Sequence, residues 1–126
     1  MVIMQVFVVE PQPRWGPELK RQFLNRTDVR IRELSRLAEA AGHVPQPDLI
    51  VLDAAVGAAE AARFLVARTT EQAAVPVVYV ESPEADRLEW VLREMGAVSI
   101  QPHRVTGDEL ARLISRLLQT SQPHQQ

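Results

Sequence analysis

The sequence contains no cysteine and only one lysine, and each shortage excludes a kind of chemistry. Without cysteine the chain has no disulfide framework, thiolate nucleophile or cysteine-based zinc site. The three histidines, His43, His103 and His124, fall in three separate predicted loops without the spacing of metal ligands, so we expect no metal site and no cofactor. The single lysine is Lys20, and the other thirteen of the fourteen basic residues are arginine.

Long apolar runs and an excess of one charge are also missing. No stretch approaches the roughly 20 consecutive apolar residues of a membrane span. Residues 1–7 lack the basic region and the cleavage site of a signal peptide. The formal net charge is −2, so no basic field favours nucleic acid as a direct partner. We therefore expect a cytoplasmic protein that binds neither membranes nor nucleic acid directly.

The length and composition fit one globular domain. A chain of 126 residues is long enough for one hydrophobic core, and 46% apolar with 24% charged residues is close to the average for globular proteins. The last residues are polar and lack an apolar pattern. We predict a domain over residues 1–120, followed by a polar C-terminal tail over residues 121–126.

Strand patterns alternate with helix patterns along the chain. Short apolar or alternating runs predict five strands, at residues 6–9, 29–32, 49–52, 75–80 and 97–100. Between and after them, helices are predicted from near Pro17, from Ser35, over 54–72, over 82–95 and from a capping box at Thr106. Such alternation indicates a parallel sheet with helices on both faces. The predicted class is α/β: a flavodoxin-like five-stranded parallel sheet, order 2-1-3-4-5, with five helices.

In this fold the functional crevice lies outside the carboxyl ends of the strands. Glu10 follows the first predicted strand, Asp53 the third and Glu81 the fourth, while Gln101 follows the fifth. We therefore expect an acidic pocket of Glu10, Asp53 and Glu81. No residue in this set has the partners of a catalytic nucleophile, and no serine is paired with a histidine as in a hydrolase. No catalytic residue is predicted.

Several of these segments resemble bacterial response-regulator receiver domains. Pro47-Asp48-Leu49-Ile50-Val51-Leu52-Asp53 is similar to the third strand of that family and its phosphoacceptor aspartate. Residues 75–80 resemble the fourth strand, and Gly96-Ala97 followed by Pro102 resembles the approach to the fifth strand and its Lys-Pro pair. The resemblance extends from Val6 to Leu118. It implies a receiver fold, a phosphoacceptor-equivalent position at Asp53 and a role in two-component signal transduction.

Three positions depart from the pattern of the family. Receivers usually carry two adjacent acids after the first strand that help to hold Mg²⁺, and here Glu10 is followed by Pro11. The Ser or Thr that receivers carry after the fourth strand corresponds to Glu81, whose charge would repel a phosphoryl group. The lysine before the proline corresponds to Gln101. No shift of register restores it, because Lys20 lies in the first predicted helix.

These departures favour a pseudo-receiver, a degenerate member of the family that acts as a phosphorylation-independent protein–protein interaction module in bacterial signalling or transcription regulation and is not an enzyme. The alternative is an active receiver phosphorylated on Asp53 in a two-component phosphorelay, with Mg²⁺ held by Glu10 and Asp53. A small nucleotide- or flavin-binding enzyme on the same fold is a third class. Two interpretations of Asp53 stay open: a phosphoacceptor, or a carboxylate that caps a helix or pairs with an arginine.

Trp90 is a candidate interface residue. It lies two positions from Leu88 and from Leu92 in the buried stripe of its predicted helix, about 200° around the helix from each. Exposed tryptophan is enriched at binding surfaces; the other interpretation is packing on a neighbouring loop or the last helix. We expect a protein partner or a second copy, with a homodimer through the fourth helix, strand 5 and the fifth helix. Charged residues on the same side would form the rim: Arg87, Glu94, Arg112 and Arg116.

Overall fold

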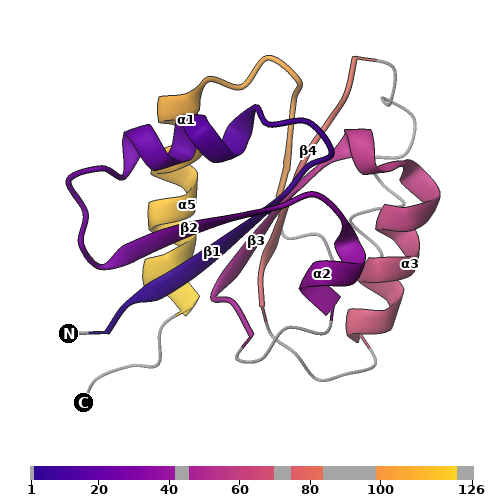
Figure 1. Cartoon of the computed structure of the whole chain (residues 1–126), viewed down its shortest axis with the longest axis horizontal. Coiled ribbons are helices and arrows are strands. Elements are labelled where there is room, and N and C mark those ends of the chain that lie inside the picture. Colours follow the sequence, from indigo (N-terminus) through magenta and orange to yellow (C-terminus); the bar gives the residue numbers. More distant parts are fainter. Residues whose placement is uncertain (1, 42–45, 70–74, 84–98, 122–126) are drawn as a thin grey trace.

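In the computed structural model the chain forms a five-stranded sheet with helices on both faces (Figure 1). The structure describes residues 2–41, 46–69, 75–83 and 99–121. The strands are β1 (Met4–Val9), β2 (Val29–Leu34), β3 (Leu49–Asp53), β4 (Val77–Val80) and β5 (Ser99–Gln101). They lie in the order β2-β1-β3-β4-β5, and every neighbouring pair is parallel. The predicted flavodoxin-like sheet is confirmed.

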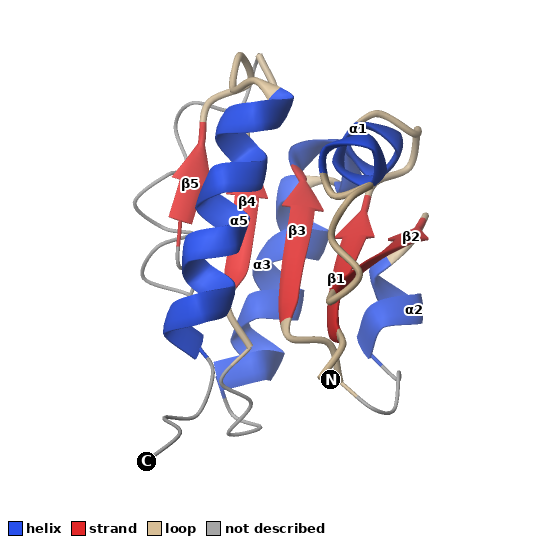
Figure 2. Cartoon of the chain, turned by 90° about the vertical axis from the view of Figure 1, so that its left-hand side faces the viewer, coloured by secondary structure: helices blue, strands red, loops and turns tan. Residues whose placement is uncertain are grey.

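The described residues contain four α-helices and one 3₁₀ turn: α1 (Trp15–Gln22), α2 (Leu37–Ala41), η1 (Ala54–Val56), α3 (Ala58–Thr69) and α5 (Gly107–Ser121). Figure 2 shows α1 and α5 on one face of the sheet and α2 and α3 on the other. The helix predicted over 82–95 falls almost wholly on residues outside the described ranges. None of the described helices is long and apolar enough to span a membrane.

The predicted helix over 54–72 is interrupted near its start. The chain first makes η1, and α3 begins only at Ala58. Between them lies Gly57, whose φ of 103° falls in the left-handed region that side chains with a Cβ rarely adopt. The segment predicted to be mostly helical is thus helical in two parts, η1 and α3, on either side of Gly57. The glycine permits the change of direction.

Two apolar layers hold the helices to the sheet. Alternate side chains of the central strands point to opposite faces, and both faces are buried, which explains their continuous apolar sequences. The α1–α5 layer is built from these buried residues, among others: Val6, Val8, Val51, Leu19, Leu110, Ile114 and Leu118. The α2–α3 layer includes these: Phe7, Val9, Ile50, Leu52, Leu65 and Tyr79. Each fully buried Val, Leu, Ile or Phe contributes about 1.5–3 kcal/mol.

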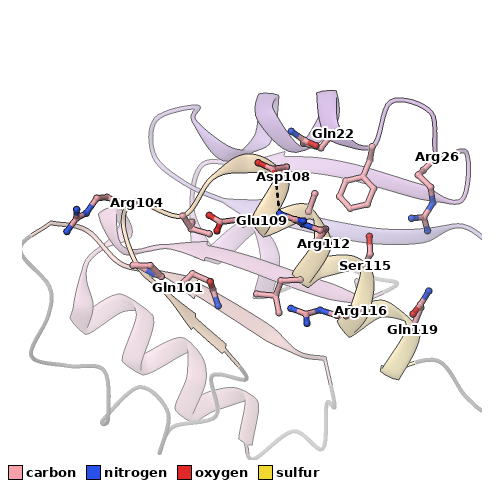
Figure 3. A pocket seen from close by; sticks show the side chains of 15 residues that line it. Gln22, Arg26, Gln101, Arg104, Asp108, Glu109, Arg112, Ser115, Arg116 and Gln119 are labelled. Carbon is pink, nitrogen blue, oxygen red and sulfur yellow. Dashed lines mark hydrogen bonds and ion pairs between the residues drawn. The ribbon is translucent and has the colours of Figure 1, made fainter.

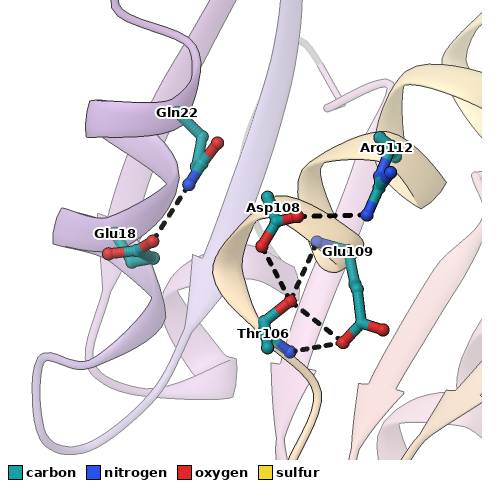
Figure 4. Close-up of polar contacts among 6 residues, drawn as sticks. All are labelled: Glu18, Gln22, Thr106, Asp108, Glu109 and Arg112. Carbon is teal, nitrogen blue, oxygen red and sulfur yellow. Dashed lines mark hydrogen bonds and ion pairs between the residues drawn. The ribbon is translucent and has the colours of Figure 1, made fainter.

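The capping box predicted at Thr106 is present at the start of α5 (Figure 4). The backbone N–H of Thr106 donates to Glu109 Oε1 at 2.9 Å, and the Glu109 N–H donates to Thr106 Oγ1 at 3.2 Å. The Thr106 N–H is the main reason that the pKa of Glu109 lies below its usual value. This cap fixes where α5 begins, directly after the loop that follows β5.

Candidate functional site

The predicted site residues meet at the carboxyl edge of the sheet. Val9 at the end of β1 pairs with Leu52 of β3, and Asp53 pairs with Val80 at the end of β4. Val80 also pairs with Gln101, the last residue of β5. The backbone therefore brings the positions after β1, β3, β4 and β5 to one edge, as predicted from the parallel topology. Their side chains are engaged in different ways.

Glu10 is buried, with 4% of its surface exposed, and its carboxylate caps α1. It accepts the backbone N–H groups of Arg14 at 3.0 Å, Trp15 at 2.9 Å and Gly16 at 2.8 Å. The next residue, Pro17, has no N–H. The four amide positions that a helix N-terminus normally leaves without partners are thus all accounted for. These contacts explain why α1 begins at Trp15, two residues before Pro17, near which the sequence predicts its start.

The alternation of β1 directs Glu10 toward α1. Val6 and Val8 face the layer that contains α1 and α5, and Glu10 continues the same two-residue period beyond the end of the strand. A carboxylate at a helix N-terminus is also favoured by the helix dipole. Sequence reasoning missed this role. The available signal was an acid shortly before a helix whose N-cap residue, Arg14, provides no side-chain cap.

Asp53 is half-buried and caps the 3₁₀ turn η1. Its Oδ1 accepts the backbone N–H of Ala55 at 2.8 Å. Of the interpretations left open for Asp53, the capping contact is therefore observed, and no arginine ion pair to Asp53 occurs among the described residues. The phosphoacceptor role stays a prediction.

The electrostatic effect of Asp53 and Glu81 is visible at Tyr79 in β4. Burial is the main cause that raises the pKa of the Tyr79 phenol, and the negative charges of Asp53 and Glu81 raise it further. Both carboxylates therefore lie close enough to Tyr79 to affect the pKa of its phenol. The Glu81 backbone N–H donates to the Gln101 backbone oxygen at 2.9 Å, which continues the β4–β5 pairing beyond Val80.

Gln101, which occupies the lysine position of the family, and Lys20, the one lysine of the sequence, both have partners other than Asp53. The Gln101 side chain donates from Nε2 to Ser99 Oγ at 2.7 Å, within its own strand. Lys20 lies in α1, as predicted, and its Nζ is 2.8 Å from Glu33 Oε2 of β2. The one lysine of the sequence therefore joins α1 to the edge strand.

The Mg²⁺ ion that the resemblance implies does not fit these residues. Mg²⁺ requires near-octahedral oxygen ligands at about 2.0–2.1 Å. Both oxygens of Glu10 accept N–H groups of α1, Pro11 has no carboxylate, and one oxygen of Asp53 caps η1. Within the described ranges, no three His, Asp or Glu side chains are grouped so that they could hold a metal ion. Of the histidines, only His103 lies in these ranges.

A groove of about 1200 Å³ runs along the outer side of α5 (Figure 3). Gln101 and Pro102 line it at the end of β5, and Phe23 and Arg26 line it just after α1. The α5 residues in its wall include the two arginines predicted for an interface rim, Arg112 and Arg116. Trp90, with Arg87 and Glu94, lies outside the described residues, so its predicted exposure stays a prediction.

Comparisons with known proteins agree with this architecture. No family model and no curated protein matches the sequence. The Francisella response regulator 1452 receiver domain is similar with a TM-score of 0.79 and 15% identity, over 94% of this chain and 99% of that one.

Two further receiver domains are similar over nearly their whole length. The non-phosphorylated HemR receiver domain from Leptospira biflexa has a TM-score of 0.77 and 18% identity, over 97% of this chain and 99% of that one. The BeF3-activated N-terminal receiver domain of RstA from Klebsiella pneumoniae has a TM-score of 0.72 and 21% identity, over 90% and 97%. From this likeness and its sheet order of 2-1-3-4-5, the chain has the flavodoxin-like fold of response-regulator receiver domains.

Proposed function

We propose that this chain is a pseudo-receiver, a cytoplasmic protein–protein interaction module of bacterial signal transduction or transcription regulation that works without phosphorylation. The observation that carries the proposal is the Glu10 carboxylate. It is buried beneath α1 with both oxygens hydrogen-bonded to backbone N–H groups. The acid that the receiver pattern assigns to Mg²⁺ thus serves as a helix cap.

The surroundings of Asp53 support the same function. Acyl-phosphate formation adds negative charge at one carboxylate and needs cations to offset it. Glu81 raises the pKa of Tyr79 together with Asp53 and so adds negative charge to this neighbourhood. Lys20 is paired with Glu33 on the other side of α1. No chemistry is assigned to the module, and its activity is binding.

One observation favours the alternative, an active receiver phosphorylated on Asp53. This side chain is half-buried at the carboxyl end of β3, where the family carries its phosphoacceptor. Its Oδ1 caps η1, whereas Oδ2 accepts no hydrogen bond from the described residues. A free carboxylate oxygen at this position is what attack on a phosphodonor requires.

The two functions are separated by incubation with Mg²⁺ and acetyl phosphate, followed by measurement of the intact mass. We expect no phosphate adduct on the wild type. A stoichiometric adduct that Asp53→Asn abolishes would overturn the proposal and establish the alternative. The matched positive control is the triple variant Pro11→Asp, Glu81→Thr, Gln101→Lys, which restores the three residue types of the family. We expect this variant to gain an adduct that again depends on Asp53.

The groove along α5 is the surface we assign to partner binding. It extends from the end of β5 along α5, and these are two of the three elements predicted for a homodimer. Four arginines and two acidic residues are among its lining residues. Asp108 is paired with Arg112 at 3.0 Å and Arg26 with Asp28 at 2.8 Å, so the lining keeps only a small positive excess, from Arg104 and Arg116 against Glu109. A second copy of this chain, or a protein with an acidic surface, fits this lining.

A further inference from the structure

Arg14 joins the two loops that flank the crevice, the loop between β1 and α1 and the loop between β5 and α5. Its Nη2 donates to the backbone oxygen of His103 at 2.9 Å. Its Nη1 lies 3.2 Å from His103 Nδ1. Because arginine has no acceptor, its N–H donates and Nδ1 accepts this hydrogen bond. The contact links residues 89 positions apart.

The guanidinium of Arg14 also stacks over the indole ring of Trp15. Its Cζ atom lies 4.2 Å from the centroid of the indole ring, within the range of a cation–π interaction. The ring itself is buried in the apolar layer between α1, α5 and the sheet. Arg14 is therefore held over a fixed platform while its nitrogens reach across to His103.

Glu10, at the start of the β1–α1 loop, binds the backbone of Arg14 at the end of that loop. Its Oε2 accepts the backbone N–H of Arg14, while the side chain of Arg14 donates to His103. Arg14 thus takes part in both contacts, through its backbone with Glu10 and through its side chain with His103. Together they connect the end of β1, the first turn of α1 and the loop that leads to α5.

We propose that Glu10 and Arg14 form a lock that keeps the β1–α1 and β5–α5 loops in one arrangement without a bound ion or phosphoryl group. The inference deepens the proposed function and rests on it, since a surface that binds partners independently of phosphorylation has to be set by the chain itself. Glu10 and Arg14 are positioning residues in this lock. The β5–α5 loop that they hold includes Pro102 and Val105, which line the groove along α5.

Amide hydrogen exchange tests the lock because it reports the opening of each loop separately. In the β5–α5 loop the reporter is the Val105 N–H, which donates to the Pro102 oxygen at 3.0 Å. We expect Arg14→Ala to accelerate exchange at Val105 roughly fivefold, the equivalent of one net hydrogen bond. We expect Glu10→Gln to accelerate exchange at Trp15 and, through Arg14, at Val105 as well.

Arg30→Ala is the control, because Arg30 is an exposed arginine of β2, outside both loops and the groove. We expect it to leave the Val105 exchange rate unchanged. Arg14→Lys keeps the charge but cannot make both contacts to His103, so it should accelerate exchange almost as much as Arg14→Ala. Slow exchange at Val51 in β3 verifies that each variant is folded.

Two results would overturn the lock. One is an effect of Arg14→Ala at Val105 no larger than that of Arg30→Ala. The other is an effect of Glu10→Gln confined to α1, which would make Glu10 a cap of that helix alone. The acetyl phosphate experiment tests the proposed function separately. A phosphate adduct on Asp53, together with the expected effects of Arg14→Ala and Glu10→Gln on Val105 exchange, would overturn phosphorylation independence but not the lock.

Discussion

At the edge of the crevice the buried carboxylate of Glu10 is engaged as the cap of α1. Glu10 accepts three backbone N–H groups, and Pro17 removes the need for a fourth acceptor. Hydrogen bonds to a charged acceptor are among the strong ones in proteins, at about 1.5–3 kcal/mol when partners are otherwise satisfied. Drawing Glu10 toward a metal ion would leave these buried amides without acceptors. The geometry therefore opposes a metal-binding role for this residue.

Replacement of Glu10 tests this role as a stability change. We expect Glu10→Ala to lower the free energy of unfolding by about 2–3 kcal/mol, because buried N–H groups of α1 lose their acceptor. Urea denaturation at neutral pH measures the loss, with Glu60→Ala on the exposed side of α3 as control.

The same titration distinguishes a cap from a metal ligand. We expect the urea midpoint of the wild type to stay unchanged when Mg²⁺ is added, because the described residues offer no group of side chains suited to hold the ion. A midpoint that rises with Mg²⁺ in the wild type but not in Glu10→Ala would identify Glu10 as a ligand.

At the scale of elements, α1 and α5 approach closely because α5 begins with a glycine. A Cβ on Gly107 would overlap the side chain of Glu18, which lies across the start of α5. Glu18 accepts hydrogen bonds from Arg21 and from Gln22 within α1. Figure 4 shows the contact with Gln22. The first turn of α5 is thus packed against a charged side chain of α1, next to the lock formed by Glu10 and Arg14.

We expect Gly107→Ala to cost about 0.5 kcal/mol, because the new methyl group displaces only the end of the flexible Glu18 side chain and its hydrogen bond from Gln22. In a Glu18→Ala background the same change should cost nearly nothing, so that a double-mutant cycle shows coupling. Gly57→Ala is the control: nothing lies within 4 Å of its added Cβ, but its φ of 103° strains any Cβ. Its cost should be the same in both backgrounds. Equal costs for Gly107→Ala in the two backgrounds would contradict the packing argument.

At the scale of the molecule, one sheet separates two layers with different roles. Both layers contain apolar core, and the α1–α5 side also carries the proposed lock and the arginine-lined groove. If the proposed phosphorylation-independent function is right, association through the groove should be constitutive. Phosphodonors should not change it.

Sedimentation over a concentration series tests self-association through this face. We expect the wild type to associate, and Trp90→Ala to weaken association about thirtyfold, the effect of losing roughly 2 kcal/mol at an interface anchor. Ser115→Glu within the groove should weaken it as well, whereas Ala59→Glu on the opposite face should not. If the wild type is a monomer, a different protein is the partner. If all variants associate equally, the interface lies elsewhere.

The local pattern of the sequence was sufficient to predict the sheet, its order and the cap of α5. Short β-branched runs separated by helical segments leave few topologies, because parallel strands need crossover helices of one hand. Thr106 and Glu109 are three positions apart, so their capping box depends on neighbouring residues alone. The position of Asp53 at the carboxyl end of its strand follows from the same local pattern.

Only the tertiary structure decided what the acids and arginines of the crevice do. The same Glu10 could serve a metal ion or a helix, and the choice depends on where α1 begins in space relative to β1. Arg14 and His103 meet although 89 positions separate them, because the parallel sheet brings both loops to one edge. Propensity and spacing describe neighbours along the chain, whereas the direction of a side chain at a shared edge is set by packing between elements.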